Sequence, residues 1–300
     1  MSAKIIDGKS LSAAIRHKVA SDVAALKQQG KPVRLVAVLV GDDASAKVYA
    51  ETQKRTCAQV GIEYELWPLP AETTTEQLHA AIHRLNKDGA VTGIFIHSPL
   101  PAGLDLPEAQ YQIDILKDVE GVNPANIGHV VYGHTIIAPC TALAVMELID
   151  STGVPLQGAN VTVVGASRIV GRPLSLLLTE RNATVTLCHI HTKDTAAYCK
   201  TADMVVVAVG KPGLLRPEHV KPGAVVIDVG IKRVKVTDAS GKVTEKTVGD
   251  VDFEGVSQVA GWITPVPGGV GPMTVAMALR NTVRAAKLVY GLEKPLASHL

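Results

Sequence analysis

The sequence has little of several features that would place a protein in a special class. Its net charge is only +2, from 30 basic and 28 acidic side chains, which gives no electrostatic case for binding nucleic acid or an anionic membrane. Its four cysteines form no CxxC pair, which argues against a disulfide framework or a structural zinc site. No apolar run approaches a membrane span, and the opening MSAKIIDGKS has no signal-peptide core. We therefore expect a cytoplasmic protein with no metal and no membrane partner.

Motifs of three common enzyme classes are missing as well. No GxxxxGK[ST] string occurs, which excludes a P-loop nucleotidase, and no GxSxG string occurs, which removes the usual serine-hydrolase turn. His79 and His83 have the i, i+4 spacing of a metal-binding helix, but the segment reads HAAIH and lacks the glutamate of HExxH. We interpret them as surface histidines.

The pattern of apolar residues indicates an α/β protein with two domains. A chain of 300 residues, 47% of them hydrophobic and 19% charged, is long for one α/β core and suits two domains that share a cleft. In the first half, expected helices and buried β-branched strands alternate, as in an open parallel sheet with covering helices. The helices are expected at 9–29, 46–60 and 75–86, and the strands at 34–41, 63–67 and 93–97.

Residues 98–133 break this pattern with Pro- and Gly-containing loops, which are typical of a binding loop or a linker. A helix at 141–150 then leads to a second parallel sheet. We expect its strands at 161–165, 183–188, 203–210 and 224–230, a hairpin at 234–248 around DASGK, and a helical tail at 273–290. The tail is expected to return to the first domain, so the predicted domains are 1–142 with 273–300, and 143–272.

The segment VTVVGASRIVGRPLSLLL predicts a strand, a glycine-rich turn and a helix. Such a turn presents backbone N–H groups and a helix N-terminus to a phosphate. The spacing Gly165-x-Ser167-x-x-x-Gly171 differs from the usual GxGxxG, and a tight turn that binds nothing is the alternative. Four strands of doubly wound character surround it, so we favour a Rossmann-type dinucleotide-binding domain.

The end of the second strand bears on which dinucleotide would bind. Sites for NAD usually place an acid there to hold the ribose hydroxyls, but this strand runs on as CHIHTK, with no acid before Asp194. Arg168 and Arg172 stand in the glycine loop, and His189 and His191 follow the strand. A basic pocket without an acid favours the 2′-phosphate of NADP. NAD remains the alternative, because side chains that point into water would not contact a 2′-phosphate.

The string PVPGGVGPMT at 265–274 is rich in prolines, which restrict the backbone, and in glycines, which leave it free. Its simplest interpretation is a rigid turn before the last helix. Three glycines among three prolines more often indicate a close approach of main chain to a flat ligand.

Together these strings identify a family. The chain resembles the bifunctional methylenetetrahydrofolate dehydrogenase/methenyltetrahydrofolate cyclohydrolases over nearly its whole length, and TPVPGGVGPMT with GASRIVGRP is highly specific. The matching segments are VGDDASAKVY (40–49), SPLPAG (98–103), KDVEGVNPANIG (117–128), PCTA (139–142), VVGASRIVGRP (163–173), VAVGKPG (207–213), VIDVGI (226–231), VGDV (248–251) and TPVPGGVGPMT (264–274).

The resemblance implies a folate-binding domain joined to a Rossmann-type NADP domain, commonly in a homodimer, with tetrahydrofolate as the one-carbon carrier. It places Tyr49 against the pterin, where an aromatic face is apt. Implied substrate contacts are Tyr49, Pro99, Leu100, Glu120, Pro267, Gly268 and Gly269. Implied cofactor contacts are Gly165, Ala166, Ser167, Arg168, Val170, Gly171, Arg172, Pro173, His189, His191, Thr192, Val209, Gly210, Gly230, Ile231, Gly271 and Thr274.

Three polar positions of the implied folate site depart from the family pattern. A lysine usually follows the tyrosine by four residues, where this chain has Gln53. Where the family reads QLPLP the chain reads HSPLP, which begins at His97, and where it reads DVDG the chain has DVEG, with Glu120. The implied catalytic set is therefore Tyr49, Gln53, His97 and Glu120.

These departures affect the two family reactions differently. Hydride transfer from 5,10-methylenetetrahydrofolate releases no proton and needs mainly alignment of donor and acceptor. Hydrolysis of the methenyl product needs groups that exchange protons, and a glutamine has none to exchange. We therefore expect the dehydrogenase to persist and the cyclohydrolase to be weak or lost. The alternative is a fully bifunctional enzyme in which His97 replaces the lysine as acid and base.

Two other functions stay open. The first is a dehydrogenase for a non-pterin substrate, with His97 and Glu120 re-tuned. The second is a non-catalytic folate- or nucleotide-binding regulator. Tyr49 and the intact PGGVGP string argue against the first, and the intact glycine loop argues against the second.

Overall fold

The computed structural model describes residues 2–237 and 243–294, and it divides into two compact units. The first unit comprises residues 1–12 and 141–275, and the second comprises 13–140 and 276–300. Two of the three boundaries fall inside the long helices α1 (Gly8–Gln28) and α10 (Val270–Val289), and the third falls at the start of α6 (Cys140–Asp150). Among the described residues, no helix is long and apolar enough to cross a membrane.

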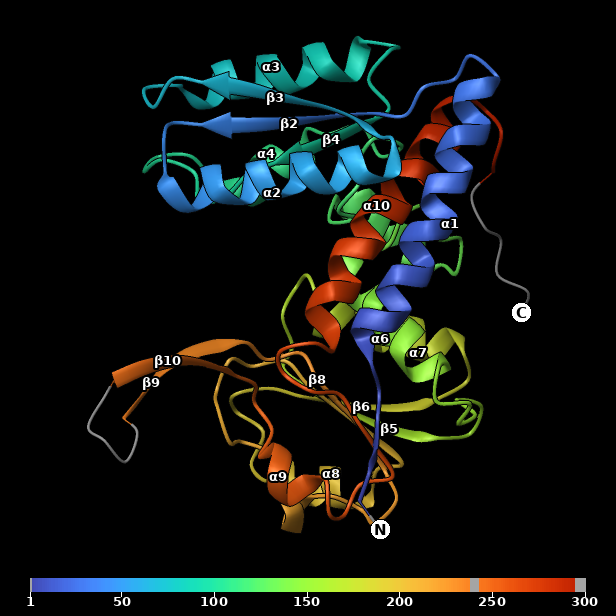
Figure 1. Cartoon of the computed structure of the whole chain (residues 1–300), viewed down its shortest axis with the longest axis vertical. Coiled ribbons are helices and arrows are strands. Elements are labelled where there is room, and N and C mark those ends of the chain that lie inside the picture. The colour runs from blue at the N-terminus through green and yellow to red at the C-terminus, as the bar shows by residue number, and fades with distance from the viewer. Residues whose placement is uncertain (1, 238–242, 295–300) are drawn as a thin grey trace. The chain divides into compact units, whose positions relative to one another are not determined.

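The second unit is built on a three-stranded parallel sheet in the order β3–β2–β4. Its central strand, β2 (Arg34–Val40), has six of seven residues buried because helices cover both of its faces. The edge strands are β3 (Glu63–Leu69) and β4 (Gly93–Ile96). Helices α2 (Ala44–Val60) and α3 (Thr75–Lys87) lie on opposite faces of the sheet (Figure 1).

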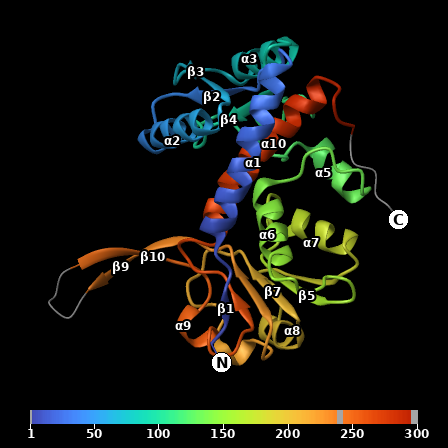
Figure 2. The same cartoon turned by 45° about the vertical axis from the view of Figure 1, so that its right-hand side comes forward.

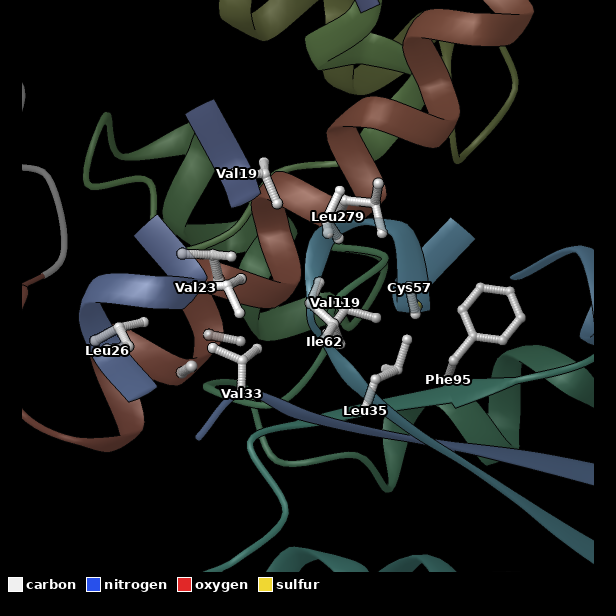
Figure 3. Close-up of a cluster of buried hydrophobic side chains, with 14 of the residues drawn as sticks. Val19, Val23, Leu26, Val33, Leu35, Cys57, Ile62, Phe95, Val119 and Leu279 are labelled. Carbon is white, nitrogen blue, oxygen red and sulfur yellow. The ribbon is translucent and has the colours of Figure 1, made fainter. Parts of the chain in front are cut away.

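Local signals in the sequence explain where these helices begin and end. Asp43 caps the start of α2, and Gly61 ends it in the left-handed region at φ 81°. Thr74 and Gln77 form a capping box at the start of α3. One face of the sheet packs on α1 and α10, where Val19, Val23 and Leu279 gather with residues of β2 in one apolar cluster (Figure 3).

The first unit is a six-stranded parallel sheet in the order β1–β11–β8–β7–β5–β6. Helices α6 and α7 lie on one face, and α8 and α9 lie on the other (Figures 1 and 2). The chain runs from β5 to one neighbour, β6, and then crosses to the other, β7, so the loops at the carboxyl ends of β5 and β7 meet at a topological switch point. The strands and helices are β1 (Lys4–Ile5), β5 (Asn160–Val164), β6 (Thr184–Cys188), β7 (Met204–Val207), β8 (Val225–Asp228), β11 (Trp262–Ile263), α6 (Cys140–Asp150), α7 (Gly171–Glu180), α8 (Thr195–Thr201), α9 (Phe253–Val256) and a 3₁₀ turn at Pro217–His219.

The expected hairpin is present as an antiparallel pair, β9 (Lys232–Thr237) and β10 (Val243–Val248). It extends from the rest of its unit as a two-stranded arm (Figure 2). The expected turn, DASGK at 238–242, lies outside the described residues.

The structure differs from the sequence-based expectations in several places. Residues 1–12 belong to the first unit because β1 pairs with β11, whereas we expected them with the N-terminal domain. The stretch 98–133, expected to be irregular, contains α4 (Leu106–Tyr111) and α5 (Pro124–Val131). Asp105 and Asn123 cap these short helices, and each helix has a proline in its first turn, a start signal that the loop-like composition concealed. The last helix begins at Val270, not Met273.

Candidate active site

Tyr49 lies on α2 in a cluster of rings in the second unit. Its ring stacks on Phe95, with centroids 6.0 Å apart and planes at 22°, and meets His97 edge-on at 5.7 Å. Phe95 and His97 share one side of the chain at the end of β4, because residues two apart on a strand point the same way. Tyr49 remains 49% exposed, so one side of its ring is open to a flat ligand.

His97 is buried and held by a second ring. It is 1% exposed, and its Nε2 is 3.1 Å from the hydroxyl of Tyr64 on β3. Its Nδ1 is buried and has no hydrogen-bond partner among the described residues. Burial disfavours the charged imidazolium and lowers the pKa of His97 to about 4. The ring is therefore neutral near pH 7 and is a poor proton donor there.

Gln53 follows Tyr49 by one turn of α2, as the sequence predicts. The side chain is half-buried, and its Oε1 is buried with no hydrogen-bond partner in the described part of the chain. An amide at this position can donate and accept hydrogen bonds, but it cannot exchange a proton at neutral pH.

Glu120 is the titratable group of the cluster whose pKa lies nearest neutrality. One carboxyl oxygen, Oε2, accepts a hydrogen bond of 3.1 Å from Nε2 of Gln110 on α4. Burial, with a smaller contribution from the nearby Asp118, raises the pKa of Glu120 to about 8. Burial also raises the pKa of Tyr49, and the nearby charge of Glu120 adds to that shift, so the two side chains interact electrostatically. The carboxyl of Glu120 is mostly protonated at pH 7.

The backbone around Glu120 is fastened by buried polar groups. Asp118, 1% exposed, accepts hydrogen bonds from the backbone N–H groups of Gly121 and Asn123 and from Nδ2 of Asn126. Lys117 is buried too, and its ammonium donates to the carbonyls of Leu85, Asn86 and Asp88 at the end of α3. These bonds fix the segment that carries Glu120.

Asn281 of α10 completes this anchoring. Its Nδ2 lies 3.0 Å from each of the carbonyl oxygens of Val119 and Ala138 and 3.4 Å from Sγ of Cys140. Nothing in the local sequence predicts this contact, because its partners lie more than a hundred residues away. Phe95, Tyr64 and Gln110 were also missed, because their contacts with Tyr49, His97 and Glu120 join separate elements of the fold.

The two other expected substrate residues of this unit follow β4. A cis peptide bond joins Ser98 to Pro99. Pro99 is exposed, whereas Leu100 is half-buried and packs against the apolar cluster between the sheet and α3.

The glycine loop of the first unit has the expected strand–turn–helix form. Gly165 has φ 115°, and a Cβ there would lie 2.3 Å from the carbonyl oxygen of Ala208. A Cβ on Gly171 would lie 1.7 Å from the carbonyl oxygen of Gly165, so the turn is closed too tightly for a side chain at either position. The Ser167 hydroxyl accepts a hydrogen bond of 3.2 Å from the N–H of Val170. Arg168 and Arg172 are exposed, Ala166 is half-buried and Pro173 is buried in the first turn of α7.

The other expected cofactor residues of this unit also lie in loops that follow strands. After β6, His189 and His191 are exposed, and the Thr192 hydroxyl accepts from the N–H of His189 at 2.9 Å. Val209 and Gly210 are exposed after β7, and Ile231 is 69% exposed next to the buried Gly230 after β8. All of these loops are at the carboxyl edge of the sheet, where doubly wound folds bind ligands.

The PGGVGP segment belongs to the first unit. Val266 and Pro267 are joined by a cis peptide bond, and Gly268 has φ 118°. A Cβ on Gly8 would lie 1.9 Å from the carbonyl oxygen of Gly269, so these two backbones touch. Gly271 is exposed, and the hydroxyl of Thr274 donates back to the carbonyl of Val270 within α10. The expected substrate residues are therefore distributed over both units.

Over the described residues, the structure contains no cluster of three or more His, Cys, Asp or Glu side chains placed to hold a metal ion. All four cysteines are free thiols.

Comparisons with known proteins agree with this arrangement. Family models described as "Tetrahydrofolate dehydrogenase/cyclohydrolase, catalytic domain" and "NAD(P)-binding domain" of the same family match residues 6–120 and 139–290. The bifunctional protein FolD of Acetivibrio thermocellus is 46% identical over 96% of this chain and 98% of its own, and that of Moorella thermoacetica is 46% identical over 96% and 100%.

Solved structures show the same fold. The bifunctional FolD enzyme of Campylobacter jejuni has a TM-score of 0.88 and 41% identity, covering 96% of this chain and 99% of that one. The methylenetetrahydrofolate dehydrogenase-cyclohydrolase of Trypanosoma brucei, solved with NADP and an inhibitor, has a TM-score of 0.87 and 37% identity over 96% and 98%. Because both halves match the family in order and nearly in full, the chain belongs to the tetrahydrofolate dehydrogenase/cyclohydrolase family.

Proposed function

We propose that the protein oxidises 5,10-methylenetetrahydrofolate to 5,10-methenyltetrahydrofolate and passes the hydride to NADP. The glycine turn at 165–171, closed too tightly for side chains and opening into α7 at a switch point of the sheet, is the observation that carries the proposal. Bound NADP would accept the hydride. The folate then gains one positive charge and the nicotinamide loses one, and no proton is released.

The second unit would bind the folate. In this proposal the open side of Tyr49 stacks on the pterin, and Pro99, Leu100 and Glu120 contact the substrate. The Gln53 amide and the neutral His97 supply hydrogen-bonding groups to the same substrate. We also propose Pro267, Gly268 and Gly269 as substrate residues, as the family resemblance implies. These residues need only hold the donor carbon in place, because hydride transfer requires alignment more than proton exchange.

We propose NADP over NAD because basic side chains and no acid directly follow the neighbouring strands β5 and β6. Arg168 and Arg172 are exposed after β5, and His189 and His191 are exposed after β6, which suits a 2′-phosphate. The Trypanosoma brucei relative was solved with NADP. The remaining contacts are proposed at the positions that the family resemblance implies, in a chain that we expect to form a homodimer.

We further propose that the second family activity, methenyltetrahydrofolate cyclohydrolase, is weak or lost. Gln53 has no proton to exchange where the family usually has lysine. The alternative, in which His97 acts as acid and base, requires a ring that is protonated part of the time near neutral pH. The low pKa of His97 and its hydrogen bond to Tyr64 count against that role.

One pair of assays tests both parts. Methylenetetrahydrofolate and NADP are added to the purified protein, and NADPH formation is followed by absorbance; turnover is expected. Binding of both ligands without turnover would instead indicate a regulator, and failure to bind folate would indicate a dehydrogenase for another substrate.

In the second assay, methenyltetrahydrofolate is supplied without nicotinamide, and its loss is compared with the rate in buffer. We expect little acceleration. A rate equal to that of a bifunctional relative measured in parallel would contradict the proposed loss, and loss of that rate in H97A would then assign the replacement to His97.

A further inference from the structure

Two buried aspartates lie behind the loops that follow β7 and β8 in the first unit. Asp228 is the last residue of β8 and is 3% exposed, and Asp250 follows β10 and is fully buried. Burying a carboxylate costs free energy unless hydrogen bonds compensate for it, so the hydrogen-bond partners of these two aspartates indicate their role. Neither residue has a role in the function proposed above.

Asp250 makes its hydrogen bonds to the chain through a single oxygen. Its Oδ2 accepts from the backbone N–H groups of Val209 at 2.8 Å and Gly210 at 2.9 Å, two consecutive residues of the loop after β7. Its Oδ1 is buried and has no hydrogen-bond partner among the residues that the structure describes. One carboxylate oxygen therefore orients two consecutive N–H groups of this loop.

Asp228 uses both of its oxygens. Oδ1 accepts from the N–H groups of Gly230 at 3.0 Å and Asp250 at 2.9 Å, and Oδ2 accepts from the N–H of Val251 at 3.0 Å. Asp228 thus fixes the turn after β8 and also holds the backbone of Asp250 in place.

Two glycines show how closely the carboxyls fill this space. A Cβ on Gly230 would lie 2.2 Å from Cγ of Asp250, and a Cβ on Gly249 would lie 1.9 Å from Oδ2 of Asp228. The two carboxyl groups occupy the volume that side chains at 230 and 249 would need. The backbone of both loops and the two carboxyl groups are therefore packed against one another, and neither loop can shift without the other.

We propose that Asp250, held by Asp228, is a positioning residue for the dinucleotide: it sets the two loops, 208–210 and 229–231, that face the cofactor at the carboxyl ends of neighbouring strands. The inference rests on the proposed NADP function. Its physical basis is that charge-assisted hydrogen bonds to buried N–H groups are strong and directional, so they decide which backbone groups remain for the ligand. Asp250 itself acts through the loops.

Because Asp250 accepts through one oxygen and Asp228 through both, substitutions to asparagine should affect the two positions differently. D250N keeps an oxygen that can accept from both Val209 and Gly210, whereas D250A removes the acceptor. We expect D250A to raise the KM for NADP by about tenfold or more and D250N by less than about threefold, because small displacements of ligand-positioning groups have effects of that order. The KM for methylenetetrahydrofolate should change less than about twofold in either variant, since the tether acts on the dinucleotide loops.

D252A is the matched control on the same segment. Asp252 caps α9 by accepting from the N–H of Gly255, and within the described part of the chain its side chain makes no hydrogen bond to residues 208–210 or 229–231. D252A should lower Tm and leave the KM for NADP unchanged. Equal increases in the KM for NADP in D250A and D252A would show general destabilisation and overturn the proposal, as would an unchanged KM in D250A.

D228N provides a second comparison if D250A does not fold. An asparagine at 228 must replace one accepting oxygen with an N–H₂ group, so at least one of its three backbone bonds is lost. The KM for NADP should therefore rise more in D228N than in D250N, and equal values would overturn the assignment. NADP binding to the wild-type protein is measured first: a wild type that does not bind NADP refutes the proposed function itself, whereas a wild type that binds and variants that bind equally refute only this inference.

Discussion

At position 53 the side chain lies one helical turn after Tyr49, and its buried oxygen accepts no hydrogen bond from any described residue. A lysine placed there would bring an amine that exchanges protons to the same point. Since the Gln53 amide cannot exchange a proton near pH 7 and the imidazole of His97 is neutral there, a lysine at this position would add an acid–base group beside Tyr49.

We therefore expect Q53K to accelerate hydrolysis of methenyltetrahydrofolate by about 10²-fold or more, the usual contribution of a positioned acid–base group. The measurement is the loss of methenyltetrahydrofolate without nicotinamide. K54R is the control for a substitution elsewhere on this helix, because Lys54 is exposed and lies about 100° further around the helix axis. A Q53K variant no faster than the wild type would show that residue 53 does not limit the reaction.

Glu120 predicts a dependence of stability on pH. Its pKa is raised from 4.5 to about 8 in the folded protein, so the folded state holds this proton more tightly than the unfolded state does. The stabilising contribution is complete below about pH 4.5 and is lost as pH rises to about 8. E120Q, which mimics the protonated form, should gain in Tm relative to the wild type as pH increases over this window. A Tm difference that does not vary with pH would mean that the Glu120 pKa is ordinary.

At the scale of an element, the turn from β5 into α7 depends on two glycines for close approach of the backbone. G171A would place a methyl group 1.7 Å from the carbonyl oxygen of Gly165, so the turn must open. We expect the affinity for NADP to fall by about tenfold or more, because the N–H groups would no longer converge on the phosphate.

Titration with NADP measures this effect, and G128A is the matched control. Gly128 lies in α5, and a Cβ there would meet nothing within 4 Å. This variant should bind NADP like the wild type and be slightly more stable, since alanine favours a helix over glycine. Equal affinity in G171A and the wild type would remove the turn from the binding site.

At the scale of the whole molecule, the cofactor should stabilise the native state by mass action. At a free NADP concentration of 100 times its Kd, the free energy of unfolding should rise by about 2.7 kcal/mol, which is visible as an increase in Tm. NAD at the same concentration should give a smaller shift, because the loop after β6 offers His189 and His191 rather than an acid for the ribose. Equal shifts with both nucleotides would contradict the preference for NADP.

Much of the fold follows from local patterns. The RLVAVLV run predicts a strand buried on both faces, and the glycine spacing at 165–171 predicts the turn into α7. The short elements β1 and β11 were not predicted, because two-residue strands have no periodicity and exist only through their pairing. That pairing also moved residues 1–12 to the first unit.

The sequence by itself determined the family, the glycine turn and the three departures at 53, 97 and 120, since each is a matter of residue identity and spacing along the chain. Only the tertiary structure decided the protonation of His97 and Glu120, because burial that shifts a pKa is produced by distant parts of the chain. The bonds of Asn281 to Val119 and of Asp250 to Val209 are equally non-local. Hydrogen bonds between residues far apart in sequence leave no local pattern, and they are formed only when folding brings the elements together.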